Sequence, residues 1–314
     1  MKILGLIGTL SGAALIATAL STTAFAQDGF PAGDITFVVQ AAAGGASDRS
    51  SRALAAEMEK ELGVSFIVEN RPGASGTVAF AHVAEQAPDG YTIGFSPVEF
   101  AILENIGYDD FDRSEFTYLG QIMNSPVVLA VPADSPYNTL GEFITAAEGT
   151  QLSVANSGAA SSFAAATVTL ANMTGAQLNP VPFDGGAPAV AAALGGHVDA
   201  VAAGAGEATT PYNDGTLKIL AIFDDERHPA LPDVPTAQEE GYDLTFGAWG
   251  GVYGPAGIPD DVVAVLQDAV EKAALSDAFR DAVSPAGIIP VFRPGAEFEE
   301  FIASEAARYA EVLN

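Results

Sequence analysis

Residues 37–49 read Phe37-Val-Val-Gln-Ala-Ala-Ala-Gly-Gly-Ala-Ser-Asp-Arg49. An apolar strand here passes through a turn of small residues into the start of a helix. Small residues let the backbone come close to a ligand, and a helix start offers free N–H groups to an anion. A second glycine-bearing turn follows at residues 68–76, Val-Glu-Asn-Arg-Pro-Gly-Ala-Ser-Gly. The two turns predict a site that holds a small anion.

The pattern of strands and helices extends along the chain and predicts an α/β fold with mainly parallel sheets. The expected strands cover residues 35–40, 65–68, 91–95, 127–131 and 251–254. The expected helices cover residues 48–62, begin near 140 and 260, and end the chain at 297–313. Ser47 or Asp48 is a suitable N-cap for the first of these helices, and Gly63 is expected to end it.

The chain after residue 26 is longer than one compact core usually holds, which favours two domains. Two strand–proline–helix units, around Pro132 and Pro255, are candidate crossings between them. On this interpretation domain 1 is discontinuous, with residues 27–126 and 247–314, and domain 2 is residues 127–246. The final helix is expected to pack on domain 1.

The first 26 residues have the pattern of an export signal. Lys2 supplies the positive end, residues 3–20 are uncharged and mostly apolar, and Ala24-Phe25-Ala26 fits a cleavage site. We expect cleavage after Ala26 and a periplasmic protein; a membrane anchor is the alternative. Cysteine is absent, so the chain has no disulfide or thiolate chemistry.

The chain carries 12 basic and 40 acidic residues, a formal net charge of −28. This charge argues against nucleic-acid partners and anionic membrane surfaces. It also repels an anionic ligand at long range. We interpret it as a solvated acidic surface, with repulsion that salt screens.

A third turn, Leu152-Ser-Val-Ala-Asn-Ser-Gly-Ala-Ala-Ser-Ser162, again joins a strand to a helix, and a fourth surrounds Phe183-Asp184-Gly185. Two such turns facing across a cleft would hold an anion between two domains. As structure alone, Ser161 or Ser162 is an N-cap, and Asp184 forms a turn. The candidate ligand-binding residues are Ala42, Ala43, Gly44, Gly45, Ser47, Asp48, Ser96, Ser157, Gly158, Ser161, Ser162, Phe183, Asp184 and Gly185.

Signatures of catalysis are not met. Gly73-Ala-Ser-Gly76 lacks the G-x-S-x-G spacing of a hydrolase elbow, and Gly204-Ala-Gly206 lacks the third glycine of a dinucleotide fingerprint. The three histidines have no partner at metal-ligand spacing. No sequence pattern marks out an acid–base pair among the many carboxylates. We therefore expect no catalytic residue, metal or cofactor.

Several segments together resemble the extracytoplasmic solute receptors of tripartite tricarboxylate transporters, the Bug or TctC-like receptors. The resemblance covers essentially the whole chain after the export signal. The segments are Gly44-Gly45…Ser47-Asp48, Val68-Glu-Asn-Arg-Pro-Gly73, Ala87-Pro-Asp-Gly-Tyr-Thr92, Val181-Pro-Phe183, Leu194-Gly-Gly-His-Val-Asp199, Pro229-Ala-Leu-Pro-Asp-Val-Pro-Thr-Ala237 and Gly254-Pro-Ala-Gly-Ile-Pro259. Their order and spacing are specific, although each alone is weak.

The resemblance implies a two-domain periplasmic-binding-protein fold, type II-like, that closes on a small carboxylate. It also implies a monomer that delivers its ligand to a membrane permease with one large and one small subunit. Phe183-Asp184-Gly185 departs from the family's frequent Tyr-Lys-Gly, and Ala203 replaces a frequent Asp, with Glu207 nearby. The alternatives are a periplasmic sensor for a two-component kinase and a hydrolase or lyase on the same scaffold.

Overall fold

The computed structural model describes residues 29–108, 111–158, 161–183 and 185–313. The expected export signal and Asp184 lie outside these ranges, so both remain predictions. Residues 31–314 group as one unit by their internal contacts.

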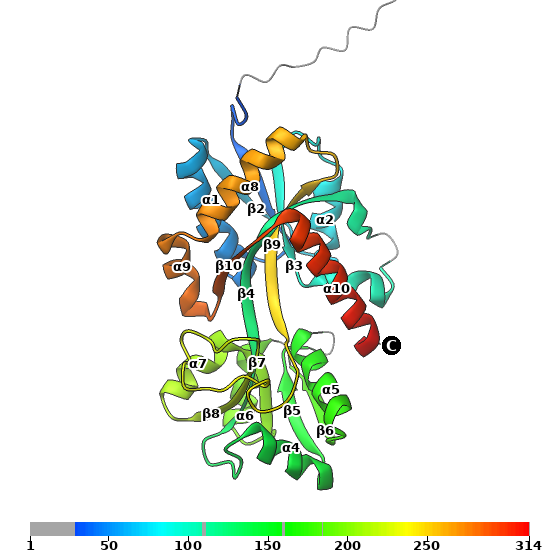
Figure 1. Cartoon of the computed structure of the whole chain (residues 1–314), viewed down its shortest axis with the longest axis vertical. Helices are drawn as coiled ribbons and strands as arrows, with labels where there is room; N and C mark the ends of the chain where they lie inside the picture. Colours follow the sequence, from blue (N-terminus) through cyan, green and yellow to red (C-terminus); the bar gives the residue numbers. More distant parts are fainter. Residues whose placement is uncertain (1–28, 109–110, 159–160, 184, 314) are drawn as a thin grey trace, which may run out of the picture. The chain divides into compact units, whose positions relative to one another are not determined.

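The strands form two sets that share β4 (Figure 1). The first set contains β1 (Ile35–Val39), β2 (Phe66–Asn70), β3 (Thr92–Pro97), β9 (Gly247–Pro255) and β10 (Ile289–Pro294). The second contains β5 (Leu152–Asn156), β6 (Leu178–Pro182), β7 (Ala200–Gly204) and β8 (Leu217–Phe223). β4 (Phe116–Pro132) pairs with β9 and β10 through its first part and with β7 and β8 through its second.

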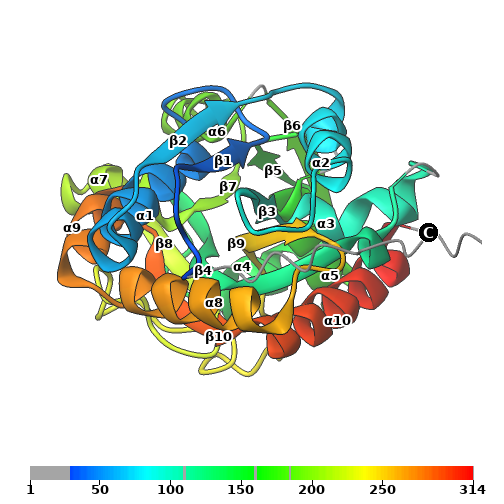
Figure 2. The same ribbon diagram turned by 90° about the horizontal axis from the view of Figure 1, so that it is seen from above.

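The helices connect these strands and cover their faces. They are α1 (Ala46–Leu62), α2 (Thr77–Ala84), α3 (Glu99–Ile102), α4 (Leu140–Gly149), α5 (Ser162–Thr174), α6 (Gly186–Leu194), α7 (Ala205–Asn213), α8 (Asp260–Ala274), α9 (Asp277–Val283) and α10 (Gly295–Leu313). Short 3₁₀ turns are η1 (Ala74–Gly76), η2 (Leu103–Ile106), η3 (Arg113–Glu115) and η4 (Ser284–Ala286). Seen from above, α1 and α2 lie on opposite sides of β1 and β3 (Figure 2).

Apart from β4, which belongs to both sets, strands of one set that follow one another through a helix are parallel. β1 pairs in parallel with β2 and β3, and β5 pairs in parallel with β6 and β7. β4 and β9 are antiparallel to each other, and each is antiparallel to its other neighbours. The α/β fold is therefore confirmed, whereas the expectation of mainly parallel sheets is wrong: of the described strand pairs, four are parallel and five, all involving β4 or β9, are antiparallel.

Aromatic packing closes the core of the first set. The ring of Tyr253 in β9 lies 4.9 Å from that of Phe100 and 5.0 Å from that of Phe116, measured between centroids. A Cβ at Gly94 would lie 2.4 Å from the Tyr253 ring, so only glycine fits at this point of β3. Large aromatic rings contribute much of the buried apolar area that holds such a core together.

Helix boundaries agree with the sequence at several points. α4 begins at Leu140, α8 begins at Asp260, and Gly63 ends α1 in the left-handed conformation, with φ +70°. The predicted N-cap of α1 is wrong: the cap is Gly45, and the helix begins at Ala46. Asp48 instead lies inside the first turn, and its carboxylate binds the groups described below.

Candidate ligand-binding site

The carboxyl ends of the parallel strands of both sets meet at one place on β4. Pro97 at the end of β3 pairs with Gly250 of β9, and Gly250 pairs with Met123 of β4. Gly204 at the end of β7 pairs with Val127, a short way further along β4. Because β3 and β4 are both antiparallel to β9 while β7 is antiparallel to β4, the two ends point toward each other. Ligands of open α/β sheets bind beyond such ends, which makes this crossing the candidate site.

The turn between β1 and α1 is shaped by Asp48, which is only 3% exposed. Its carboxylate accepts hydrogen bonds from the Gly44 N–H at 2.8 Å, from Arg52 Nε at 2.9 Å and from Asn70 Nδ2 at 2.9 Å. Burial alone would raise the pKa of Asp48, but these hydrogen bonds and the Arg52 charge outweigh it and lower the pKa. Asp48 therefore positions the turn, and its oxygens are already occupied.

The rest of this turn remains open to a ligand. Ala42, Ala43, Gly44 and Gly45 are exposed, and Gly44 adopts a positive φ of +88°. Ser47 is half-buried, and its hydroxyl accepts a hydrogen bond from Gln40 Nε2 at 3.1 Å. No side chain of the described chain caps α1. The first N–H groups of this helix therefore remain available to an anion.

The turn between β5 and α5 uses one of its predicted donors internally. Ser161 is the N-cap of α5: its oxygen accepts the Ala164 N–H at 3.2 Å, and its hydroxyl donates to the Gly158 carbonyl at 2.7 Å. Ser162 is buried, whereas Ser157 and Gly158 are half-buried. The interpretation of Ser161 as a cap is therefore confirmed, and its one proton is not free for a ligand.

Three strands end at polar side chains that have an unsatisfied buried atom. These are Gln40 Oε1 after β1, Ser96 Oγ in β3 and Asn156 Nδ2 in β5, each without a hydrogen-bond partner in the described ranges. Ser96 and Asn156 are fully buried. Buried polar atoms in native proteins nearly always have partners, so three at one row of strand ends make this row the candidate place for a ligand.

Asn156 is held so that its amide N–H groups stay free. Its Oδ1 accepts the Gly158 N–H at 3.1 Å, and its backbone carbonyl accepts the Phe183 N–H at 2.9 Å. Asn156 therefore links the β5–α5 turn to the β6–α6 turn. Phe183 is half-buried against the core of the second set, and Gly185 caps α6 with φ +118°.

Sequence reasoning found Ser96 but missed Gln40 and Asn156. A single polar residue directly after an apolar strand was the available signal, in Val39-Gln40 and Ala155-Asn156. Such residues are common at strand ends, so only their unsatisfied atoms single them out.

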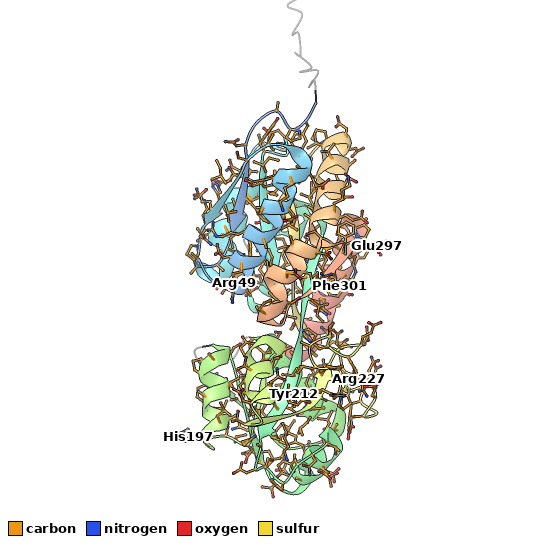
Figure 3. The ribbon with its side chains drawn as sticks, turned by 90° about the vertical axis from the view of Figure 1, so that its left-hand side faces the viewer. Arg49, His197, Tyr212, Arg227, Glu297 and Phe301 are labelled. Atoms are coloured by element: carbon orange, nitrogen blue, oxygen red, sulfur yellow. The ribbon has the colours of Figure 1, made fainter. Side chains whose placement is uncertain are left out.

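One cation lies at the start of α1. Arg49 is exposed, and within the described residues it forms no ion pair, whereas Arg52 is bound to Asp48. Figure 3 shows Arg49 at the end of α1 that faces the elements of the second set. It is the basic side chain closest in sequence to the first candidate turn.

Two other features, a metal centre and a membrane-spanning helix, are absent from the described residues. They contain no group of three or more His, Cys, Asp or Glu side chains arranged to hold a metal ion. Nor does any of their helices have the length and apolar character needed to cross a bilayer. The donors at the strand ends suit binding of an oxyanion by hydrogen bonds.

Comparison with known proteins matches this arrangement. The family model described as "Tripartite tricarboxylate transporter family receptor" (TctC) matches residues 50–314. The chain is 28% identical to the protein BugT of Bordetella pertussis, over 95% of this chain and 94% of that one.

Two solved structures are also similar. A TctC solute binding protein from Polaromonas shares 32% identity, with a TM-score of 0.84 over 91% of this chain and 99% of its own. MatC from Rhodopseudomonas palustris, solved with bound malate, shares 32% identity, with a TM-score of 0.72 over 91% of this chain and all of its own.

Proposed function

Because the chain belongs to the receptor family of the tripartite tricarboxylate transporters, we propose that it is a periplasmic receptor for a small organic carboxylate. It delivers this ligand, chemically unchanged, to a membrane permease with a large and a small subunit. The export signal is removed after Ala26 when the chain is exported. The malate in MatC supports a carboxylate as the ligand class.

The observation that carries the proposal is the set of unsatisfied polar atoms at the crossing of β4. A ligand carboxylate there would receive hydrogen bonds from Ser96 Oγ, from Asn156 Nδ2 and from the uncapped start of α1. Hydrogen bonds to a charged group contribute about 1.5–3 kcal/mol each. These donors allow an acidic protein to bind an anion with little help from basic side chains.

We further propose that β4 and β9 connect two domains, residues 27–126 with 247–314 and residues 127–246. β4 pairs with strands of both sets, so it lies between them in the sheet order. A ligand can contact the β1–α1 turn and the β5–α5 turn at the same time only when the two domains are closed. Binding to both turns would therefore favour the closed arrangement of the domains.

Ser96→Ala tests the site directly. The substitution removes a buried hydroxyl that has no partner in the described structure, so the fold should keep its stability while carboxylate binding weakens about tenfold or more. Isothermal titration with a panel of mono-, di- and tricarboxylates measures the change.

Ser51→Ala is the matched control. Ser51 is also fully buried, and its hydroxyl also lacks a partner in the described chain, but it belongs to α1 and not to a strand end. Equal affinity in wild type and Ser96→Ala, for every ligand that binds, contradicts the proposed site. Absence of binding by any carboxylate contradicts the proposed function itself.

A further inference from the structure

Glu207 places a carboxylate between the starts of two helices. It lies in the first turn of α7, directly after β7. A Cβ at Gly186, the first residue of α6, would lie 2.7 Å from Glu207 Oε1, and a Cβ at Gly204, the N-cap of α7, would lie 2.6 Å from Oε2. Both distances are shorter than any normal contact, so a side chain at either position would displace the Glu207 carboxylate from where it lies.

The Glu207 carboxylate supplies the negative charge beside the starts of α6 and α7. It accepts hydrogen bonds from the backbone N–H groups of Gly204 and Glu207. Neither α6 nor α7 has a side-chain hydrogen bond from its N-cap residue. Negative charge near a helix start is stabilised by the unpaired N–H groups and the helix dipole. At this corner the protein itself supplies that charge.

The backbone that carries Glu207 is fixed. A Cβ at Gly206 would lie 2.0 Å from the carbonyl oxygen of Ala286, and Gly287 packs as closely against Gly206. His228 Nε2 in turn lies 3.2 Å from the Gly287 carbonyl oxygen. The start of α7 is therefore held against the η4 turn, and the Glu207 carboxylate cannot withdraw together with its helix.

Charged neighbours do not neutralise Glu207 within the described residues. The elements that pack on α7 are β4, β7, β8, α6 and η4. Of these, only β8 carries a charged residue, Lys218, and its ammonium binds Ser135 and Asn138. Burial raises the pKa of the Glu207 carboxyl, and its two backbone hydrogen bonds offset part of that rise. Glu207 is nevertheless an exposed residue, so a ligand can reach it.

We infer that Glu207 determines which group the ligand carries at the end opposite its bound carboxylate. The corner formed by α6 and α7 repels a second carboxylate and accepts a hydroxyl or ammonium group, which donates a hydrogen bond to Glu207. The preferred ligand is then a monocarboxylate with a donor at its far end. This inference rests on the proposed function, because it assumes that one carboxylate binds near Ser96 and Asn156.

Matched ligand series test the inference. Within each chain length from two to six carbons, the far end is a methyl, hydroxyl, amino or carboxylate group; the four-carbon series is butyrate, 4-hydroxybutyrate, 4-aminobutyrate and succinate. Calorimetry at pH 7 compares wild type with Glu207→Gln, which keeps the shape and removes the charge. The wild type should prefer hydroxyl or amino ends to carboxylate ends. The variant should bind the dicarboxylate at least tenfold more tightly than wild type does, and the amino acid more weakly.

A second readout is the pH dependence of the affinity for dicarboxylates. In wild type, dicarboxylate binding should strengthen as the pH falls from 7 to 5, because a protonated Glu207 no longer repels the second carboxylate. The ligand's own carboxylates also take up protons in this range, and that contribution should be the same in both proteins. In Glu207→Gln only this contribution should remain. Glu148→Gln is the charge-matched control, since Glu148 is exposed at the end of α4 and its variant should bind like wild type.

The outcomes separate the two proposals. If Glu207→Gln leaves the ratio of dicarboxylate to hydroxy-acid affinity unchanged, the role of Glu207 is overturned while the receptor function stands. If no member of any series binds either protein, the preference assigned to Glu207 is overturned, while the receptor function is decided by the wider panel of mono-, di- and tricarboxylates. A wild type that prefers dicarboxylates also overturns the role of Glu207.

Discussion

Asp48 shows how a residue beside a binding site can act through the backbone. Its carboxylate accepts three donors, the Gly44 N–H, Arg52 Nε and Asn70 Nδ2. Asp48→Asn keeps the shape but offers one acceptor oxygen in place of two and brings its own N–H groups against these donors. We expect the free energy of unfolding at pH 7 to fall by about 1–3 kcal/mol, measured by urea denaturation.

The stability difference between wild type and Asp48→Asn should depend on pH. The pKa of Asp48 is lowered in the folded protein, so its contribution is present above the unfolded pKa and is lost as the pH falls through the folded value. The difference between wild type and variant should therefore shrink in strong acid. Asp134→Asn, at an exposed position, is the control and should show no such difference. A constant difference at all pH values would contradict the role given to Asp48.

At this scale the sequence predicted which segments form the candidate site better than it predicted what each side chain does. The small residues of the β1–α1 turn are exposed as a ligand contact requires. Asp48 and Ser161 lie in the expected turns, but they bind their own backbone. Asp48 is not an N-cap in part because its carboxylate accepts a hydrogen bond from Asn70, which lies in β2. No local pattern contains that information.

Among the elements, β4 departs most from the sequence prediction. The pattern predicted a strand at 127–131 only, whereas β4 covers Phe116–Pro132. Its middle contains Gln121, Asn124 and Pro126, which interrupt the apolar pattern, and its register with β9 shifts there. A strand that changes partners along its length has no single periodicity, and the sequence pattern showed only Val127–Val131 although Tyr118–Met123 is buried as well. The other strand and helix types depend on local signals and agreed.

His228 links two elements that are distant in sequence. Its Nδ1 accepts the Ala230 N–H at 3.1 Å, and its Nε2 lies 3.2 Å from the Gly287 carbonyl oxygen just before β10. Only the neutral ring with its proton on Nε2 satisfies both contacts. Burial lowers the pKa of His228, and the hydrogen bond to Gly287 offsets part of this effect. The unfolded chain therefore binds this proton more readily than the folded protein does.

This contact predicts a loss of stability in mild acid. The free energy of unfolding should decrease as the pH falls below the unfolded pKa of about 6.5, because protonation then favours the unfolded chain. Urea denaturation at pH 7.5 and 5.0 measures the decrease, which should be smaller in His228→Gln. His197→Gln, at an exposed histidine, should behave like wild type. Equal pH dependence in all three proteins would show that His228 is not responsible.

For the whole molecule, the net charge of −28 is the dominant electrostatic fact. Repulsion among so many carboxylates destabilises a compact state, and salt screens it: the Debye length falls from about 30 Å at 0.01 M to about 3 Å at 1 M. We expect the melting temperature at pH 7 to rise with sodium chloride over this range, measured by circular dichroism. The rise should be much smaller near pH 4.1, the isoelectric point. A salt effect of equal size at both pH values would point to a cause other than charge repulsion.

The shared strand β4 also limits how this chain can be rearranged by recombination. A recombination junction within Phe116–Pro132 would divide β4 between two parent sequences. Either β9 and β10, or β7 and β8, would then pair with a strand that comes partly from the other parent. Neither half of the sheet could then be exchanged between relatives as an independent module. Viable chimeras should instead have their junctions in exposed turns, such as Ala256-Gly257 directly after β9, where no strand is divided.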